Sequence, residues 1–456
     1  ECRAWVWRPD ELPVLTSVDG TAVSASAPIL TANATPALVW SNADTNADAA
    51  FVYTVDIAQM GGDGEGSHYM YVQPLHPSIM NFTIPQAKAL PVGIYLWTVV
   101  QMKTSPGFEQ TLGEGWALDL QAVQGGDMTP FFVYGPDNDD AVLATTNGYG
   151  VGRIGVSLDD NGDFTDASAL HGTNTFSGTT AMTYSVTAND GSSGSGAELY
   201  AYSDTTRDLV ITDSGMTPHR GFTGRTKEIL TTVQSTDRSF PCITAGARRY
   251  KTTDFNNTDL NGNWVFIQGQ ININTGSFDG ASCTVGSATG DSTALPNPLF
   301  TVSFKDNSGS TQTIPVPYSV ASDGLLTMTI DDSTDPDTTA RGYIGGSSGN
   351  EVLVMAVDNN AEMPWFLIAV RDNGALDGKI AADITGDYSF TELYIEQDTG
   401  PVLESATALR GTVTFDGSGN YTSGYTTLEG ETQQYSGTYS VSDNAGTADD
   451  RMHLDI

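Results

Sequence analysis

Basic residues are scarce in this chain. Its 456 residues include 19 lysines and arginines against 55 aspartates and glutamates, which gives a formal net charge of −36. Binding to nucleic acid needs clustered basic side chains that neutralise phosphates, and docking to anionic membranes needs basic patches as well. The charge therefore argues against both partners. It suits an extracellular protein that repels copies of itself, or one that attracts cations.

Long apolar runs are missing, and cysteine is rare. No run reaches the roughly 18 apolar residues of a membrane-spanning helix, and the longest, residues 363–370, has the length of a buried strand. The three cysteines form no Cys-x-x-Cys pair, which argues against zinc, haem and thioredoxin-like sites. A disulfide between Cys242 and Cys283 is one interpretation, and two separate buried thiols are the other. Cys2 is left over, either unpaired or paired with another chain.

No catalytic constellation stands out. The five histidines show no spacing typical of a metal site or a triad. Residues 345–349 match Gly-x-Ser-x-Gly, but a nucleophile elbow needs a strand, a sharp turn and then a helix. Here the sequence predicts a glycine- and serine-rich turn between two strands. We therefore predict a protein that is not an enzyme.

Turn-forming residues, by contrast, are abundant. The chain has 49 glycines and many threonines, serines, aspartates and asparagines, a composition typical of short strands linked by tight turns. Hydrophobic alternation is clear over residues 37–40, 51–57 and 94–100. This pattern predicts a β-sandwich of about seven strands over residues 12–124.

Several residues of this segment match a known pattern. Trp40 stands where a buried tryptophan of a second strand is expected, and Tyr53 where an aromatic of a third strand is expected. Residues 90–97 look like a leucine-to-tyrosine corner, with about one residue fewer between the leucine and the tyrosine. In these features, residues 12–124 resemble a fibronectin type III domain, which implies a sandwich fold. The chain has no Arg-Gly-Asp triplet, so integrin-style adhesion is not implied.

A block of sequence then occurs twice, at residues 220–248 and 341–371. Both copies begin with Arg-Gly-aromatic-x-Gly and continue with a glutamate, a proline and an arginine. The matched residues are Arg220, Gly221, Gly224, Glu228, Pro241 and Arg248 in the first copy and Arg341, Gly342, Gly345, Glu351, Pro364 and Arg371 in the second. The block closes a repeat whose period of about 120 residues suits a whole small domain better than a propeller blade or a solenoid coil.

Three such repeats follow the sandwich, over residues 125–251, 252–376 and 377–456, the last one incomplete. Each consists of short predicted strands with tight turns between neighbours, which predicts an antiparallel barrel or sandwich. The repeats resemble tandem β-domains of bacterial surface and secreted proteins. The predicted fold is therefore all-β, and the resemblance implies an extracellular or cell-surface location.

Four aspartate-rich loops, at residues 137–140, 159–163, 254–261 and 331–337, are the best metal candidates. Calcium takes six to eight hard oxygen ligands, which such loops can supply. Aspartate is also a common turn former, so ordinary turns are the alternative. The predicted calcium ligands are Asp159, Asp160, Asp163, Asp331, Asp332 and Asp335.

The third repeat lacks a closing block in this sequence. A sheet without its last strands exposes unpaired backbone donors and acceptors and is a template for another strand. Residues 1–11 are similar to a closing strand, because Cys2 and Arg8 have the spacing of Cys242 and Arg248. We hypothesise that residues 2–8 of one copy add to the open sheet of another and form a head-to-tail homopolymer. The predicted assembly residues are Trp5, Val6, Trp7, Met452, Leu454 and Ile456.

Other interpretations stay open. The natural chain simply continues past Ile456, or residues 1–11 are an ordinary first strand of the next domain. A different class of function is a glycan- or ligand-binding module of a secreted or surface protein. That function predicts a concave aromatic patch and saturable binding. One added strand also cannot replace a whole closing block, so strand addition would leave part of the gap.

Overall fold

The fold was analysed in a computed structural model of the whole chain. The described residues are 13–23, 28–41, 51–59, 68–75, 79–103, 129–135, 138, 143–144, 148–159, 161–178, 180–212, 218–234, 239–251, 253–294, 296–305, 310–330, 338–357, 360, 362–373, 380–397, 402–426, 432–442 and 451–455. Within these ranges, no helix is long and apolar enough to cross a membrane. The chain forms two compact units, residues 1–138 with 215–217, and residues 139–214 with 218–456. The prediction of an all-β fold is confirmed.

The first unit contains two β-sheets that enclose one core. The first sheet has the strand order β2-β1-β4-β7, and the second has the order β3-β9-β8-β5-β6. The strands are β1 (Val14–Val18), β2 (Thr21–Ala22), β3 (Ile29–Thr31), β4 (Ala37–Ser41), β5 (Phe51–Gln59), β6 (His68–Leu75), β7 (Asn81–Thr83), β8 (Gly93–Lys103) and β9 (Thr129–Val133). Apolar side chains from both sheets, including Trp40 and Trp97, form its core.

The tyrosine of the predicted corner lies in this core. Tyr95 is fully buried, and its hydroxyl donates a 2.7 Å hydrogen bond to the Pro91 carbonyl oxygen. This bond to backbone a few residues upstream is the contact expected of a tyrosine corner. The side chain of Tyr53 lies outside the described part of the chain. β9 pairs with β8, so this unit extends beyond the boundary we expected at residue 124.

The second unit begins with two closed barrels, each of eight antiparallel strands in sequential order. In barrel 1, the first strand pairs with the last, as it does in barrel 2. The strands of barrel 1 are β10 (Tyr149–Leu158), β11 (Phe164–Ser177), β12 (Ala181–Ala188), β13 (Ser193–Tyr202), β14 (Asp208–Thr212), β15 (Pro218–Thr223), β16 (Ile229–Gln234) and β17 (Cys242–Arg248). Those of barrel 2 are β18 (Gly262–Asn274), β19 (Ser277–Asp291), β20 (Leu299–Lys305), β21 (Thr311–Val320), β22 (Leu325–Ile330), β23 (Thr338–Ser347), β24 (Asn350–Val357) and β25 (Trp365–Arg371).

The two copies of the closing block form the last three strands of each barrel. The block gives β15 to β17 in barrel 1 and β23 to β25 in barrel 2. The predicted hairpin turn at residues 345–349 is confirmed, because Ser347 pairs with Asn350 where β23 turns into β24. The sequence repeat is therefore the part of each domain that completes its barrel.

The barrels pack against each other along a seam lined with glycines. A Cβ atom on Gly150 would lie 2.1 Å from the Tyr343 Cβ, and one on Gly345 would lie 2.6 Å from the Ala247 carbonyl carbon. Apolar residues of both barrels, among them Val352 and Phe366, belong to one core cluster that spans this seam. The absence of a side chain at these glycines is thus what lets the strands approach.

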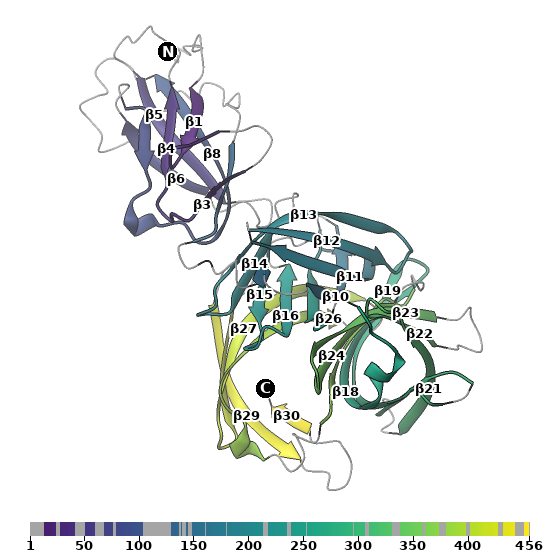
Figure 1. The fold of residues 1–456 in the computed structure, drawn as a ribbon. Coiled ribbons are helices and arrows are strands. Elements are labelled where there is room, and N and C mark those ends of the chain that lie inside the picture. Colours follow the sequence, from purple (N-terminus) through teal and green to yellow (C-terminus); the bar gives the residue numbers. More distant parts are fainter. Residues whose placement is uncertain are drawn as a thin grey trace. The chain divides into compact units, whose positions relative to one another are not determined.

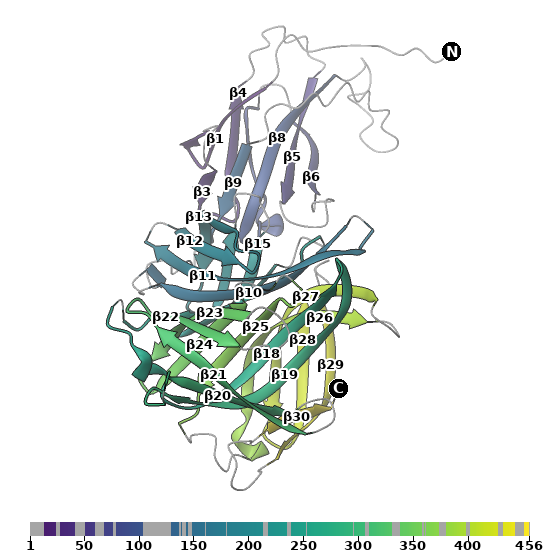
Figure 2. The ribbon, with the colours of Figure 1, turned by 90° about the vertical axis from the view of Figure 1, so that its right-hand side faces the viewer.

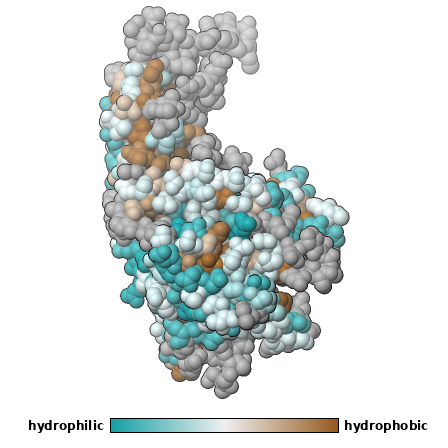
Figure 3. All heavy atoms as spheres, turned by 45° about the vertical axis from the view of Figure 1, so that its right-hand side comes forward, coloured by the Kyte–Doolittle hydropathy of each residue, from teal (hydrophilic) through white to brown (hydrophobic). Residues whose placement is uncertain are grey.

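The third repeat forms an open sheet of five strands in sequential order (Figures 1 and 2). They are β26 (Thr385–Gln397), β27 (Leu403–Asp416), β28 (Asn420–Thr426), β29 (Thr432–Ser442) and β30 (Arg451–Asp455). Arg410 connects this sheet to barrel 1, since its guanidinium lies 3.6 Å from Asp208 and 5.8 Å from the centre of the Phe222 ring. In Figure 3, the visible face of the second unit is mostly teal to white, with a brown, hydrophobic patch near its middle.

Candidate functional site

An arginine from the last strand closes one end of barrel 2. The Arg371 guanidinium lies over the Trp264 ring of the first strand, 4.7 Å from its centre. It donates to the carbonyl oxygen of Asp259 at 2.6 Å and to that of Asn261, and it forms an ion pair with Glu351. The side chains of Arg371 and Glu351 are 15% and 9% exposed. A largely buried, fully paired cation therefore joins the first, seventh and eighth strands.

Barrel 1 has the same arrangement in outline. Tyr149 takes the place of the tryptophan, and Arg248 is its partner in the register of β10 and β17. Burial raises the pKa of the Tyr149 hydroxyl, and the positive charge of Arg248 partly opposes that rise. The aromatic-arginine pair thus marks the junction of first and last strands in both closed barrels.

The open sheet of the third repeat, β26 to β30, is called the third sheet. It has counterparts of the elements that surround Arg371 in barrel 2. The short 3-10 helix η4 (Ala381–Asp383) precedes β26, as η3 (Asn257–Leu260) precedes β18. The Tyr439 hydroxyl donates to the carbonyl oxygens of Ala381 at 2.9 Å and Ile384 at 2.8 Å. In barrel 2, the hydroxyl of Tyr318 donates in the same way to Asn257, at 2.9 Å.

The aromatic residue at the equivalent position of the third sheet, Tyr388, is exposed to solvent. Tyr388 follows a glycine by two residues, as Trp264 does, and it contacts Phe415 edge-on with ring centres 5.4 Å apart. Trp264 is 1% exposed, whereas Tyr388 is 45% exposed. The difference arises because β26 pairs only with β27 among the described strands, while β18 has β25 on its other side.

Aromatic side chains cover the face of the sheet that corresponds to a barrel interior. Rings of Phe415, Tyr421 and Tyr439 are buried, with Phe415 and Tyr439 4.9 Å apart. Tyr394, on the same side of β26 as Tyr388 by strand alternation, is 43% exposed. The inner face is therefore packed towards β28 and β29 and open along β26.

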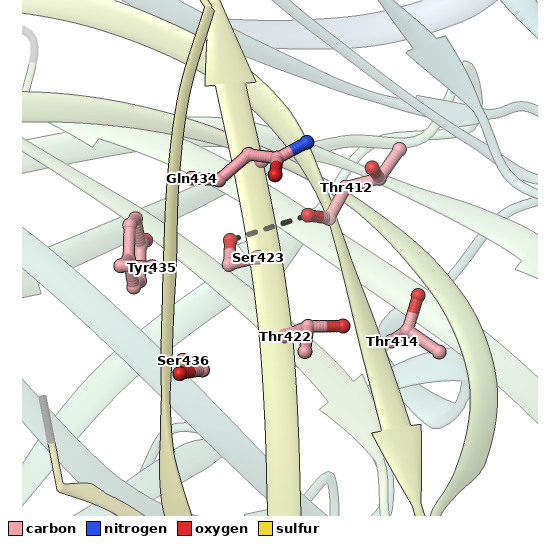
Figure 4. A pocket seen from close by; sticks show the side chains of 8 residues that line it. Thr412, Thr414, Thr422, Ser423, Gln434, Tyr435 and Ser436 are labelled. Carbon is pink, nitrogen blue, oxygen red and sulfur yellow. Dashed lines mark hydrogen bonds between the residues drawn. The ribbon is translucent and has the colours of Figure 1, made fainter.

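A polar groove of about 520 Å³ lies on β27 to β29 (Figure 4). Within it, the Ser423 hydroxyl donates to the Thr412 carbonyl oxygen at 3.2 Å. Its lining is entirely uncharged and consists of Thr412, Thr414, Thr422, Ser423, Gly424, Gln434, Tyr435 and Ser436. Such a lining can offer hydroxyl and amide hydrogen bonds to a neutral polar ligand.

Of the six predicted calcium ligands, Asp159 and Asp163 lie in the described part of the chain. Asp159 accepts hydrogen bonds from the backbone amides of Asp163 and Asn161, at 2.9 and 2.8 Å, which lowers its pKa. Its carboxylate thus shapes a turn, the alternative role for such aspartates. Within the described ranges, no cluster of three histidine, cysteine or acidic residues could hold a metal. The other predicted ligands that lie outside those ranges are Asp160, Asp331, Asp332 and Asp335.

The two predicted disulfide partners are not joined. Cys242 is buried inside barrel 1, where its thiol donates to the Gln234 side-chain oxygen at 3.5 Å, and Cys283 is exposed on barrel 2. Among the predicted assembly residues, Trp5, Val6, Trp7 and Ile456 lie outside the described part of the chain. Met452 and Leu454 lie on β30, paired with Val441 and Tyr439 of β29.

A cluster of three neighbouring polar side chains in barrel 1 could not be predicted from the sequence. His219, Gln234 and Cys242 are neighbours across β15, β16 and β17. Burial, reinforced by the positive charge of Arg153, lowers the pKa of His219 to about 3. No sequence spacing indicates this cluster, because only the strand register brings the residues together.

Comparison with known proteins gives little. No family model and no curated protein matches the chain. A protein of unknown function from the DUF3598 family of Nostoc punctiforme is similar at 8% identity with a TM-score of 0.21, over 51% of this chain and 98% of that one. Transferrin binding protein B of Neisseria meningitidis is similar at 10% identity with a TM-score of 0.24, over 74% of this chain and 84% of that one.

A double mutant of the Haemophilus parasuis transferrin binding protein B gives a TM-score of 0.18 at 10% identity, over 90% of this chain and 88% of that one. Scores this low carry no inference about function. The resemblances to fibronectin type III and to bacterial surface β-domains therefore stay predictions. What the fold does define, over the described residues, is an all-β protein with a first unit of two sheets, two closed barrels and a further open sheet of five strands.

Proposed function

We propose that this is a non-enzymatic extracellular structural or adhesive protein whose third sheet accepts strands from a second copy. The observation that carries the proposal is the edge of β26, which has no second neighbour among the described strands. The corresponding strands β10 and β18 each pair with the last strand of their barrel. An edge of this kind offers backbone hydrogen bonds for strand addition, and the exposed tyrosine face beside it adds apolar contact.

The charge of the chain sets the conditions for assembly. Copies with a formal charge of −36 repel one another, and salt of about 0.15 M screens such repulsion beyond about 8 Å. Assembly through short-range backbone pairing should therefore increase as the salt concentration rises.

Sedimentation velocity and electron microscopy of the full chain test the proposal. We expect polymers that grow with protein concentration and that are lost when residues 1–10 are deleted. A chain in which residues 2–8 are scrambled keeps the composition and is the matched control, and it should also fail to polymerise. A full chain that stays monomeric at high salt, or polymers that survive the deletion, would contradict the proposal.

The second candidate function is a glycan- or ligand-binding module. It is favoured by the exposed rings of Tyr388 and Tyr394, because aromatic rings present flat apolar faces with a polar edge. A glycan array followed by calorimetry on the monomer tests this function. Tyr388→Ala should abolish saturable binding, while Thr414→Ala in the polar groove serves as the control. Binding that needs Thr414 but not Tyr388 would move the site to the groove.

A further inference from the structure

We propose that the interior of barrel 1 binds a small carboxylate, with Arg153 as the cation that pairs with it. The site lies in a different repeat from the third sheet, and it does not depend on assembly. Arg153 lies on β10, where Tyr149 and Val151 belong to the core inside the barrel. Since every second residue of a strand faces the same side, the side chain of Arg153 also faces inward.

Polar side chains from the neighbouring strands surround this arginine in two adjacent rows. In one row, Thr244 of β17 lies opposite both Arg153 and Thr232 of β16. In the next row, Gln234 of β16 lies opposite His219 of β15. Residues directly opposite each other on paired strands point to the same face, so all of these side chains face the interior. The register thus gathers a guanidinium, an imidazole, an amide and two hydroxyls inside the barrel.

Barrel 2 shows that closure of the fold does not require these polar residues. It has the same strand order and pairing, but apolar, buried side chains at the equivalent interior positions. Polar groups placed inside a protein cost free energy unless they are hydrogen-bonded, so a structural role alone gives no reason for the difference. In equivalent order, the residues are His219, Thr232, Gln234 and Thr244 in barrel 1, and Ala340, Met355, Val357 and Leu367 in barrel 2.

The positive charge of Arg153 has no counter-ion among the described residues. Its guanidinium lies 5.2 Å from the centre of the Phe240 ring, and it forms no ion pair within the described ranges. Burial, together with this nearby positive charge, lowers the pKa of His219 to about 3, so the imidazole is neutral. The interior cluster therefore carries one uncompensated positive charge. A charge removed from water is stabilised by an opposite charge in hydrogen-bonding contact, which a bound anion would supply.

The composition of the cluster favours a carboxylate as this anion. One cation balances one negative charge, and the planar fork of a guanidinium matches the two oxygens of a carboxylate. The hydroxyls of Thr232 and Thr244 can donate further hydrogen bonds to the same group. Solvent reaches the cluster, because Arg153, His219 and Thr244 are only half-buried. A phosphate dianion, by contrast, would bring a second negative charge for which the described cluster has no cation.

Fluorine NMR of the full chain with trifluoroacetate, a very small carboxylate probe, tests the proposal. We expect the native chain to broaden the probe signal and acetate to restore it. Arg153→Gln should weaken binding about tenfold or more, and Gln268 at the equivalent position of barrel 2 shows that glutamine is compatible with the fold. Arg225→Gln is the matched control, because it removes the same charge from an exposed turn of barrel 1 and should bind like the native chain.

A second variant tests the site without removing the cation. Thr244→Leu introduces the barrel 2 residue beside Arg153 and should also abolish binding, since it fills the place of the anion. Hydrogen exchange on peptides from β10 and β17 shows whether each variant keeps barrel 1 closed. Equal broadening by the native chain and a closed Arg153→Gln variant, or no broadening by the native chain, would overturn the proposal. Displacement of the probe by inorganic phosphate at lower concentrations than acetate would overturn the assignment to a carboxylate.

Discussion

Removing the arginine that closes barrel 2 should destabilise that barrel by about 3 to 5 kcal/mol. Arg371→Ala deletes two hydrogen bonds to backbone carbonyls and a cation–π contact, and it leaves Glu351 buried without its cation. The unpaired carboxylate is the larger part of the cost, because a charge taken out of water needs a partner. Glu351→Gln in the same variant removes that charge and should recover more than half of the loss.

Hydrogen exchange is the assay suited to this prediction. A chain with several domains does not unfold in one two-state transition, so a single unfolding curve would not isolate barrel 2. Exchange measured on peptides from β18 and β25 gives the free energy of opening where the contacts are lost. Arg371→Lys keeps the charge but not the planar fork and should fall between the native chain and Arg371→Ala. A loss below about 1 kcal/mol in Arg371→Ala would refute the reasoning, since an exposed pair costs no more than that.

Other expectations concern single contacts. Burial and the positive charge of Arg153 lower the pKa of His219 to about 3 in the folded state. As the pH falls below about 6.5, this histidine therefore takes up a proton in the unfolded state while it stays neutral in the folded state. Barrel 1 should therefore lose up to about 1.4 kcal/mol of stability per pH unit as the pH falls from 6.5, a loss that His219→Gln should remove in acid titrations followed by hydrogen exchange. Tyr95→Phe leaves the Pro91 carbonyl without its donor and should cost about 1 kcal/mol in urea unfolding of the first unit. Gly342→Ala places a Cβ atom 2.1 Å from a backbone oxygen of β24 and should lower barrel 2 stability by more than about 2 kcal/mol in the same exchange experiment.

The sequence predicts the class and the repetition of this fold but not its geometry. Alternation and turn residues indicate short antiparallel strands, and the two copies of the block mark the end of each barrel. Closure itself could not be predicted, because it depends on pairing between strands about 100 residues apart, such as β18 and β25. The boundary of the first unit was misplaced for a related reason: only the pairing of β9 with β8 shows that it belongs there.

The sequence contains one residue of the barrel junction, because the repeated block includes the arginine that pairs with an aromatic residue in both closed barrels. The role of that arginine depends on which ring and which carbonyls it reaches across the barrel, and no local pattern contains this information. Calcium binding by the aspartate-rich loops stays a prediction, because aspartates that shape turns have the same sequence pattern as aspartates that bind metal.

The glycine seam between the barrels has a mechanical consequence. Strands that approach as closely as those at Gly150 and Gly345 leave no compliant layer between the two domains. Under tension, such a pair should behave as one stiff element, whereas domains on a flexible linker should extend one after the other. Stretched between its ends, the chain should yield in one large step for both barrels, and a bulkier residue at Gly150 should split that step into two.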